Sequence, residues 1–105
     1  MGIRKEIQNR VLLLDGAMGT MIQSHHLPPS AYLHQERAAT GLAEVLNLTQ
    51  GKLIVSIHRK YIESGADIIE TNTFNANRIS LSEYHLEDEV ALINRRAVSL
   101  AKEAR

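Results

Sequence analysis

Two groups of small polar residues follow two apolar segments of the chain, where they could hold a small ligand. Asp15-Gly-Ala-Met-Gly19 comes directly after the apolar run Val11–Leu14, and Thr71-Asn72-Thr73 comes after Ile68-Ile69. Asp15 could point into the mouth of the sheet, and the glycines let backbone N–H groups approach a bound anion. The carboxyl ends of neighbouring parallel strands lie at one edge of a sheet. The two groups could therefore meet on one ligand.

Each group also has a purely structural interpretation. Asp15 could bond to its own backbone in a tight turn, and the hydroxyl and amide groups of residues 71–73 could cap the next segment. Glu70 and Thr71 are successive residues of a predicted strand, so one faces the inner side of the sheet and the other faces the helices, in an order that alternation leaves open. Gly16-x-x-Gly19 lacks the first spacing of G-x-G-x-x-G and is not followed by Lys-Ser/Thr. A dinucleotide or P-loop site is therefore poorly supported.

The histidines do not form a metal-binding pattern. Two are adjacent and three are isolated: His25, His26, His34, His58 and His85. No pair has the i, i+4 spacing with an acid between that a helical zinc site needs. The absence of cysteine excludes thiolate ligands and disulfides from this chain. We therefore predict no metal ligand here and assign no catalytic residue.

The apolar pattern predicts two strands among several helices. The strands are expected near 11–14 and 66–74, where β-branched, leucine and aromatic residues gather. The helices are expected over residues 3–10, about 47–64, 78–86 and 88–104. Residues 21–46 have no clear period and predict a long loop, with one helical turn near 31–38. Pro28-Pro29-Ser30 disfavours a helix at that point.

Spacing also predicts which helical residues face the interior. Ile54, Ile57 and Tyr61 share one face of the second helix, which Asn47 or Thr49 could cap and Gly65 would end. Ile79 and Leu81 are expected to point inward in the third. The last helix has the clearest period, and its predicted inner face consists of Val90, Ile93, Ala97, Leu100, Ala101 and Ala104.

This order of elements indicates the α/β class. Two strands joined through a helix pair in parallel with a right-handed crossover. Each strand would keep an open edge, so we expect residues 1–105 to be a piece of a larger α/β domain, either cut from it or completed by another chain.

Composition narrows the function classes. The chain has 105 residues, of which 12 are basic and 12 acidic, without a basic block. This balance argues against a nucleic-acid or membrane-surface partner. The longest apolar run, Val11–Leu14, is far shorter than the about 20 residues that span a membrane. The N-terminus lacks the apolar core of a signal peptide, so a cytoplasmic protein is expected.

Two long segments resemble a known family. Val-Leu-Leu-Leu-Asp-Gly-Ala-Met-Gly-Thr-Met-Ile-Gln (11–23) and Ile-His-Arg-Lys-Tyr-Ile-Glu-Ser-Gly-Ala-Asp-Ile-Ile-Glu-Thr-Asn-Thr-Phe-Asn (57–75) resemble the N-terminal part of the homocysteine-binding domain of cobalamin-dependent methionine synthases. The likeness is weakest between Gln35 and Val45, and at Gln50-Gly51, where the family usually has a proline.

The resemblance implies a (β/α)8 TIM barrel, of which this chain would supply the first two βα units. It implies a homocysteine S-methyltransferase domain in which Asp15 holds the substrate ammonium and the backbone at Gly16 and Ala17 faces its carboxylate. Thr71 and Asn72 would line the same pocket. The family's zinc is held largely by cysteines on later strands, and cobalamin and folate bind other domains, so we expect this chain alone to bind none of these and to be inactive.

Two alternatives remain open from the sequence. A related methyltransferase could use betaine or S-methylmethionine as the donor in place of methylcobalamin. A non-catalytic α/β module could instead self-associate through its open sheet edges.

Overall fold

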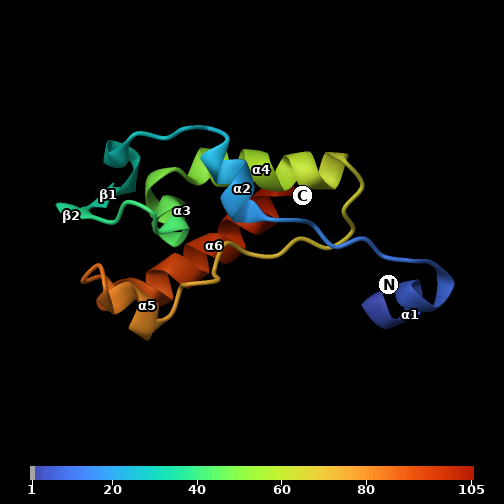
Figure 1. Ribbon diagram of the computed structural model, residues 1–105. Helices are drawn as coiled ribbons and strands as arrows, with labels where there is room; N and C mark the ends of the chain where they lie inside the picture. The colour runs from blue at the N-terminus through green and yellow to red at the C-terminus, as the bar shows by residue number, and fades with distance from the viewer. Residues whose placement is uncertain (1) are drawn as a thin grey trace.

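A computed structural model describes residues 2–105 as a mainly helical arrangement with one small sheet (Figure 1). The α-helices are α1 (Ile3–Asn9), α2 (Met18–Gln23), α3 (Leu46–Thr49), α4 (Gly51–Glu63), α5 (Arg78–Ser82) and α6 (Val90–Ala104). Three 3-10 helices are η1 (Pro29–Tyr32), η2 (Ala43–Val45) and η3 (Glu87–Glu89). Strands β1 (Leu33–His34) and β2 (Arg37–Ala38) pair antiparallel, with Leu33 opposite Ala38.

The two longest helices, α4 and α6, pack against each other and carry much of the interior (Figure 1). The predicted period of the last helix is confirmed, since Ile93, Ala97, Leu100 and Ala104 are all buried. Helix α4 begins at Gly51, where it lies close to α6. A Cβ at Gly51 would lie only 3.2 Å from a methyl carbon of Leu100. The absence of a side chain at this position lets the two helices approach closely.

The helix predicted over 47–64 is broken. Gln50, with φ −135° and ψ 48°, separates α3 from α4, and neither element has a side-chain cap. Asn47 and Thr49 were the two predicted caps, but the amide of Asn47 bonds to Asn72 and the hydroxyl of Thr49 donates to the carbonyls of Ala31 and Val45. At the other end Gly65 has φ +110°, so the prediction that a glycine ends this helix is confirmed.

The strands predicted at 11–14 and 66–74 are reduced to a single parallel bridge between Leu14 and Ile68. Ile68 donates its N–H to the carbonyl of Leu13 at 3.1 Å, and Asp15 donates to the carbonyl of Ile68 at 2.9 Å. Beyond these bonds, carboxylates replace the backbone acceptors of a ladder. The N–H of Leu13 donates to Asp67 Oδ2, and the N–H of Glu70 donates to Asp15 Oδ2. The predicted parallel direction is confirmed, but the predicted length is wrong.

Residues 21–46 contain more structure than was expected. Helix α2 covers the first part, and η1 begins at Pro29, because proline needs no N–H partner at the first position of a helix. The helical turn predicted near 31–38 is mostly the hairpin β1–β2. Its turn residues Gln35 and Glu36 both have positive φ, 51° and 64°, as a tight two-residue hairpin requires.

Buried apolar side chains form two clusters on either side of α3. One joins α2, α4 and the C-terminal half of α6; the other joins η2, α5 and the start of α6. Leu81 is buried as predicted, but Ile79 is 83% exposed, so its predicted inward position is wrong. None of the helices within residues 2–105 has the length and apolar character required to cross a membrane.

Candidate functional site

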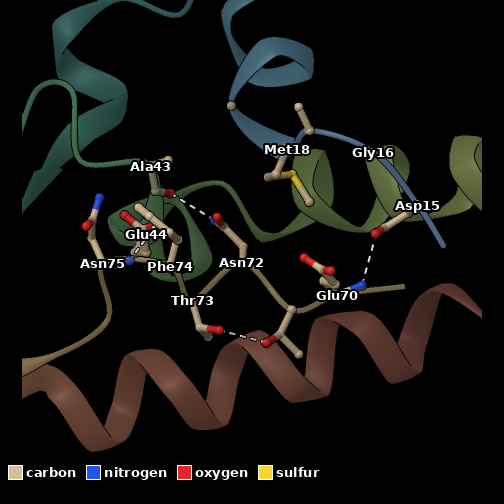
Figure 2. Close-up of a pocket in the computed structure, with 13 residues that line it drawn as sticks. Asp15, Gly16, Met18, Ala43, Glu44, Glu70, Asn72, Thr73, Phe74 and Asn75 are labelled. Carbon is tan, nitrogen blue, oxygen red and sulfur yellow. Dashed lines mark hydrogen bonds between the residues drawn. The ribbon is translucent and has the colours of Figure 1, made fainter. Parts of the chain in front are cut away.

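A cavity of about 340 Å³ lies where the segments after Leu14 and Ile69 meet η2 (Figure 2). All five predicted site residues, Asp15, Gly16, Ala17, Thr71 and Asn72, line it. The other lining residues are Met18, Gly19, Ala43, Glu44, Glu70, Thr73, Phe74 and Asn75. The single parallel bridge between Leu14 and Ile68 brings the two polar groups to this common cavity.

Asp15 links the two segments through its side chain. Its Oδ2 accepts a hydrogen bond of 3.0 Å from the backbone N–H of Glu70 (Figure 2). Its Oδ1 is buried and has no hydrogen-bond partner within residues 2–105. Asp15 therefore bonds across to the neighbouring segment and not to its own turn.

The side chain of Tyr61 in α4 holds the loop at Gly16 and Ala17. Its hydroxyl donates to the carbonyl of Ala17 at 2.9 Å, and its ring lies against Gly16, where a Cβ would come within 3.0 Å of the hydroxyl oxygen. Gly16 and Ala17 are themselves exposed and line the cavity, so a ligand there can contact this turn. The sequence marked Tyr61 only as an inward position of a helix. Its link to Ala17, 44 residues away, has no local signal.

Asn72 is buried and bonded to the elements behind the cavity. Its Nδ2 donates to the carbonyl of Ala43 and to Asn47 Oδ1, both at 3.0 Å. Asn47 returns a bond of 2.8 Å from its own Nδ2 to the carbonyl of Asn72. The amide nitrogen of Asn72 thus fixes this segment to η2 and α3, and its amide oxygen is the group that it can offer to a ligand.

Glu70 and Thr71 both line the cavity, although alternation predicted that they face opposite ways. Glu70 is exposed and projects between Asp15 and Asn72 (Figure 2). The hydroxyl of Thr71 is paired with that of Thr73 at 2.8 Å. The pleat ends before these residues, because the last backbone bond of the bridge is at Ile68.

Glu44 is a lining residue that the sequence did not single out. Its side chain is only 3% exposed; Oε2 accepts from the N–H of Asn75 at 3.2 Å, and Oε1 has no partner within the described residues. Figure 2 shows Glu44 and Asp15 at opposite ends of the cavity. Glu44 lies in the region where no regular pattern was found, so only the folded chain reveals it.

The lining carries three carboxylates, on Asp15, Glu44 and Glu70, and includes no lysine, arginine or histidine. Such a cavity attracts a cationic group and repels an anion that has no compensating charge. A ligand carboxylate could be held here only by backbone N–H groups and neutral side chains.

The residues of this chain do not fit a zinc ion. The sequence has no cysteine, which the resemblance requires as the main ligand. Within residues 2–105, no three histidine, aspartate or glutamate side chains come together in the way a metal ion needs. No metal-dependent step is therefore assigned to these residues.

Comparison with known families adds an independent finding. The family model described as homocysteine S-methyltransferase matches residues 12–105, which include every residue of the cavity and both polar groups. The match therefore covers nearly the whole chain. This chain belongs to the homocysteine S-methyltransferase family.

Proposed function

We propose that the cavity binds the amino-acid end of homocysteine and that residues 1–105 form the first two βα units of a (β/α)8 homocysteine-binding barrel. The observation that carries this proposal is the parallel pairing of Leu14 with Ile68, which places Asp15–Ala17 and Glu70–Asn72 around one cavity. Convergence at the carboxyl ends of parallel strands is where barrel enzymes bind their substrates.

Each predicted residue has a defined role in this proposal. The carboxylate of Asp15 binds the substrate ammonium, and the backbone N–H groups of the exposed residues Gly16 and Ala17 face the substrate carboxylate. Thr71 and Asn72 line the pocket from the second segment. The acidic lining supports this assignment, because it favours the ammonium and leaves the carboxylate to the backbone.

The role of this chain in methyl transfer is to hold and orient the substrate. A thiol with a pKa near that of cysteine, about 8.5, is mostly protonated at neutral pH, and its thiolate is the nucleophile that attacks a methyl carbon. Homocysteine S-methyltransferases typically use zinc for this deprotonation, and residues 2–105 bring together no set of side chains that would hold the ion. The remaining strands of the barrel are therefore part of the proposed enzyme.

We infer methylcobalamin, recharged from methyltetrahydrofolate, as the methyl donor of the complete enzyme. The sequence Glu-Thr-Asn-Thr-Phe-Asn at residues 70–75 supports this inference, because it resembles methionine synthases more closely than enzymes that use betaine or S-methylmethionine. Residues for binding cobalamin or folate would belong to other domains.

The binding proposal is tested by titrating the chain with homocysteine and following the backbone amide resonances by NMR. We expect the resonances of Gly16, Ala17 and Thr71 to shift. Asp15→Asn should weaken binding about tenfold or more, since hydrogen bonds to charged groups contribute roughly 1.5–3 kcal/mol. The des-amino analogue 4-mercaptobutanoate should lose no affinity in Asp15→Asn, because it lacks the ammonium and the substitution removes a charge of the same sign as its carboxylate.

Asp88→Asn is the matched control, because Asp88 is exposed on η3 and lies outside the cavity. Equal weakening by both substitutions would contradict the role of Asp15. A separate assay supplies zinc, homocysteine and methylcobalamin to the chain alone. Robust methionine formation in that assay would contradict the proposal that further barrel strands are needed.

A further inference from the structure

Helix α4 contains a histidine that is fully buried. His58 has 0% exposure and lies among the buried residues Ile54, Val55 and Ile57. Neither Nδ1 nor Nε2 is hydrogen-bonded within residues 2–105. A buried polar group without a partner costs roughly 1–3 kcal/mol. A histidine kept in such a place needs a compensating contact.

Asp15 has the complementary deficiency. Its Oδ1 is buried and has no partner in the described part of the chain, although Oδ2 accepts from the N–H of Glu70. A neutral imidazole has one N–H donor, and a carboxylate oxygen is an acceptor. Within the described residues, His58 therefore has an N–H donor without an acceptor, and Asp15 Oδ1 is an acceptor without a donor.

His58 lies on the face of α4 that is turned toward the loop beginning at Asp15. Tyr61 follows His58 by three residues, so both lie on one face. Tyr61 donates to the carbonyl of Ala17 and lies against Gly16, which shows that this face of α4 underlies the loop beginning at Asp15. Burial lowers the pKa of His58, and the negative charge of Asp15 partly opposes this effect by raising it. A neutral His58 within the electrostatic reach of Asp15 is consistent with both effects.

We propose that His58 is a positioning residue for Asp15, with one ring N–H linked to Asp15 Oδ1 through one buried water. With Glu70 N–H on Oδ2, both carboxylate oxygens are then fixed. This arrangement removes rotational freedom from the group that binds the substrate ammonium, which improves affinity by preorganisation. The proposal rests on the proposed function for its consequence, but the pairing itself can be tested without a ligand.

The pairing is tested by NMR of the histidine ring nitrogens across a pH titration of the full chain. We expect His58 to be neutral at pH 7 and to populate one tautomer. Asp15→Asn should change the ring-nitrogen shifts of His58 and lower its pKa further, because the carboxylate that favours the charged ring is removed. His25 is exposed and serves as the internal control. Unchanged shifts and an unchanged pKa for His58 in Asp15→Asn would overturn the pairing.

The consequence for binding is tested with two substitutions at His58. His58→Gln keeps an N–H donor and should retain affinity for homocysteine within about threefold. His58→Leu removes the donor and should weaken it about tenfold, while 4-mercaptobutanoate binds with unchanged affinity. Equal affinity of both variants for homocysteine, with chemical shifts that show an intact fold, would contradict the positioning role.

The two proposals fail in different ways. If the unaltered chain does not bind homocysteine, the proposed function is contradicted, and the ring-nitrogen spectra alone decide whether His58 pairs with Asp15. If homocysteine binds but the ring-nitrogen shifts and the pKa of His58 are the same in Asp15→Asn, only the positioning role is contradicted. A failure of His58→Leu to fold leaves the decision to Asp15→Asn and His58→Gln.

Discussion

Gly16 has no room for a methyl group on the side that faces Tyr61. A Cβ at this position would lie 3.0 Å from the hydroxyl oxygen and 3.2 Å from Cε1 of Tyr61. Gly16→Ala should therefore displace Tyr61 and weaken its bond to Ala17. We expect a loss of roughly 1–3 kcal/mol in the free energy of unfolding, the usual cost of overpacking, measured by urea denaturation.

Gly19→Ala is the matched control for this substitution. A Cβ at Gly19 meets nothing within 4 Å, and the residue lies inside α2. Alanine is the better helix former by about 0.5–1 kcal/mol, so this variant should be slightly more stable. If both alanine variants behaved alike, the contact between Gly16 and Tyr61 would not limit this position.

At the residue scale the sequence was informative where chemistry has a local pattern. The turn Asp15–Gly19 and the polar end of the second strand were found from residue types after apolar runs, and both line one cavity. The sequence did not point to Glu44 as a lining residue or to Asn47 as the residue that holds Asn72 behind the cavity. Their partners, Asn75 and Asn72, are 31 and 25 residues away, and no spacing rule links such positions.

At the scale of the elements, the helix with the clearest period and the parallel direction of the two strands were predictable, and the length of the strands was not. The inner face of α6 repeats over four turns, and packing against α4 requires that repeat. The segments around Leu14 and Ile68 carry apolar residues that favour strands, yet Asp67 and Asp15 capture the N–H groups that would extend the ladder. Side-chain competition for backbone donors is not visible in hydrophobic periodicity.

His58 in α4 should make the free energy of unfolding depend on pH. Burial lowers its folded pKa below the unfolded value of about 6.5. The unfolded chain therefore binds a proton first as pH falls. The stability contributed by neutral His58 is complete above about pH 6.5 and is lost as pH drops through the folded pKa.

We expect the free energy of unfolding, measured by urea denaturation, to decrease as the pH is lowered from 7.5 to 5. This one group contributes a slope of at most about 1.4 kcal/mol per pH unit. His58→Gln should remove that part of the slope, because glutamine does not titrate. His26→Gln is the control, since His26 is exposed. An unaltered slope in His58→Gln would contradict a buried neutral histidine at this position.

At the scale of the whole molecule, the chain is more extended than a closed domain of its length. Its radius of gyration is 14.9 Å, whereas a compact chain of this size has about 13 Å. Helix α1 stands away from the other helices and buries none of its residues (Figure 1). The segment that follows it leaves Val11 82%, Leu13 54% and Leu14 55% exposed. We propose that these side chains contact further strands of the barrel.

An apolar edge of this kind should make the isolated chain self-associate. We expect the apparent mass in sedimentation velocity to rise with concentration, and Val11→Lys to reduce that rise without changing helix content, because lysine blunts an exposed strand edge. Lys5→Glu, at an exposed position of α1, is the control for altered charge. Association that is indifferent to Val11→Lys would place the contact elsewhere.

The stoichiometry of that association separates two interpretations. A single well-folded oligomer would favour the rival hypothesis of a non-catalytic self-associating α/β module. A continuous distribution of aggregates would favour the barrel piece, whose edges are matched by other strands of the same domain and not by a second copy.

The paired amides of Asn47 and Asn72 have one more consequence, for the order in which the molecule assembles. They join segments 25 residues apart, and Asn47 also reaches the carbonyl of Ile93, 46 residues along the chain. This wall of the cavity therefore forms only after α3, the segment around Asn72 and α6 have come together. Hydrogen–deuterium exchange at residues 71–73 should follow the global opening reaction, so an occupied pocket would slow exchange as far away as α6.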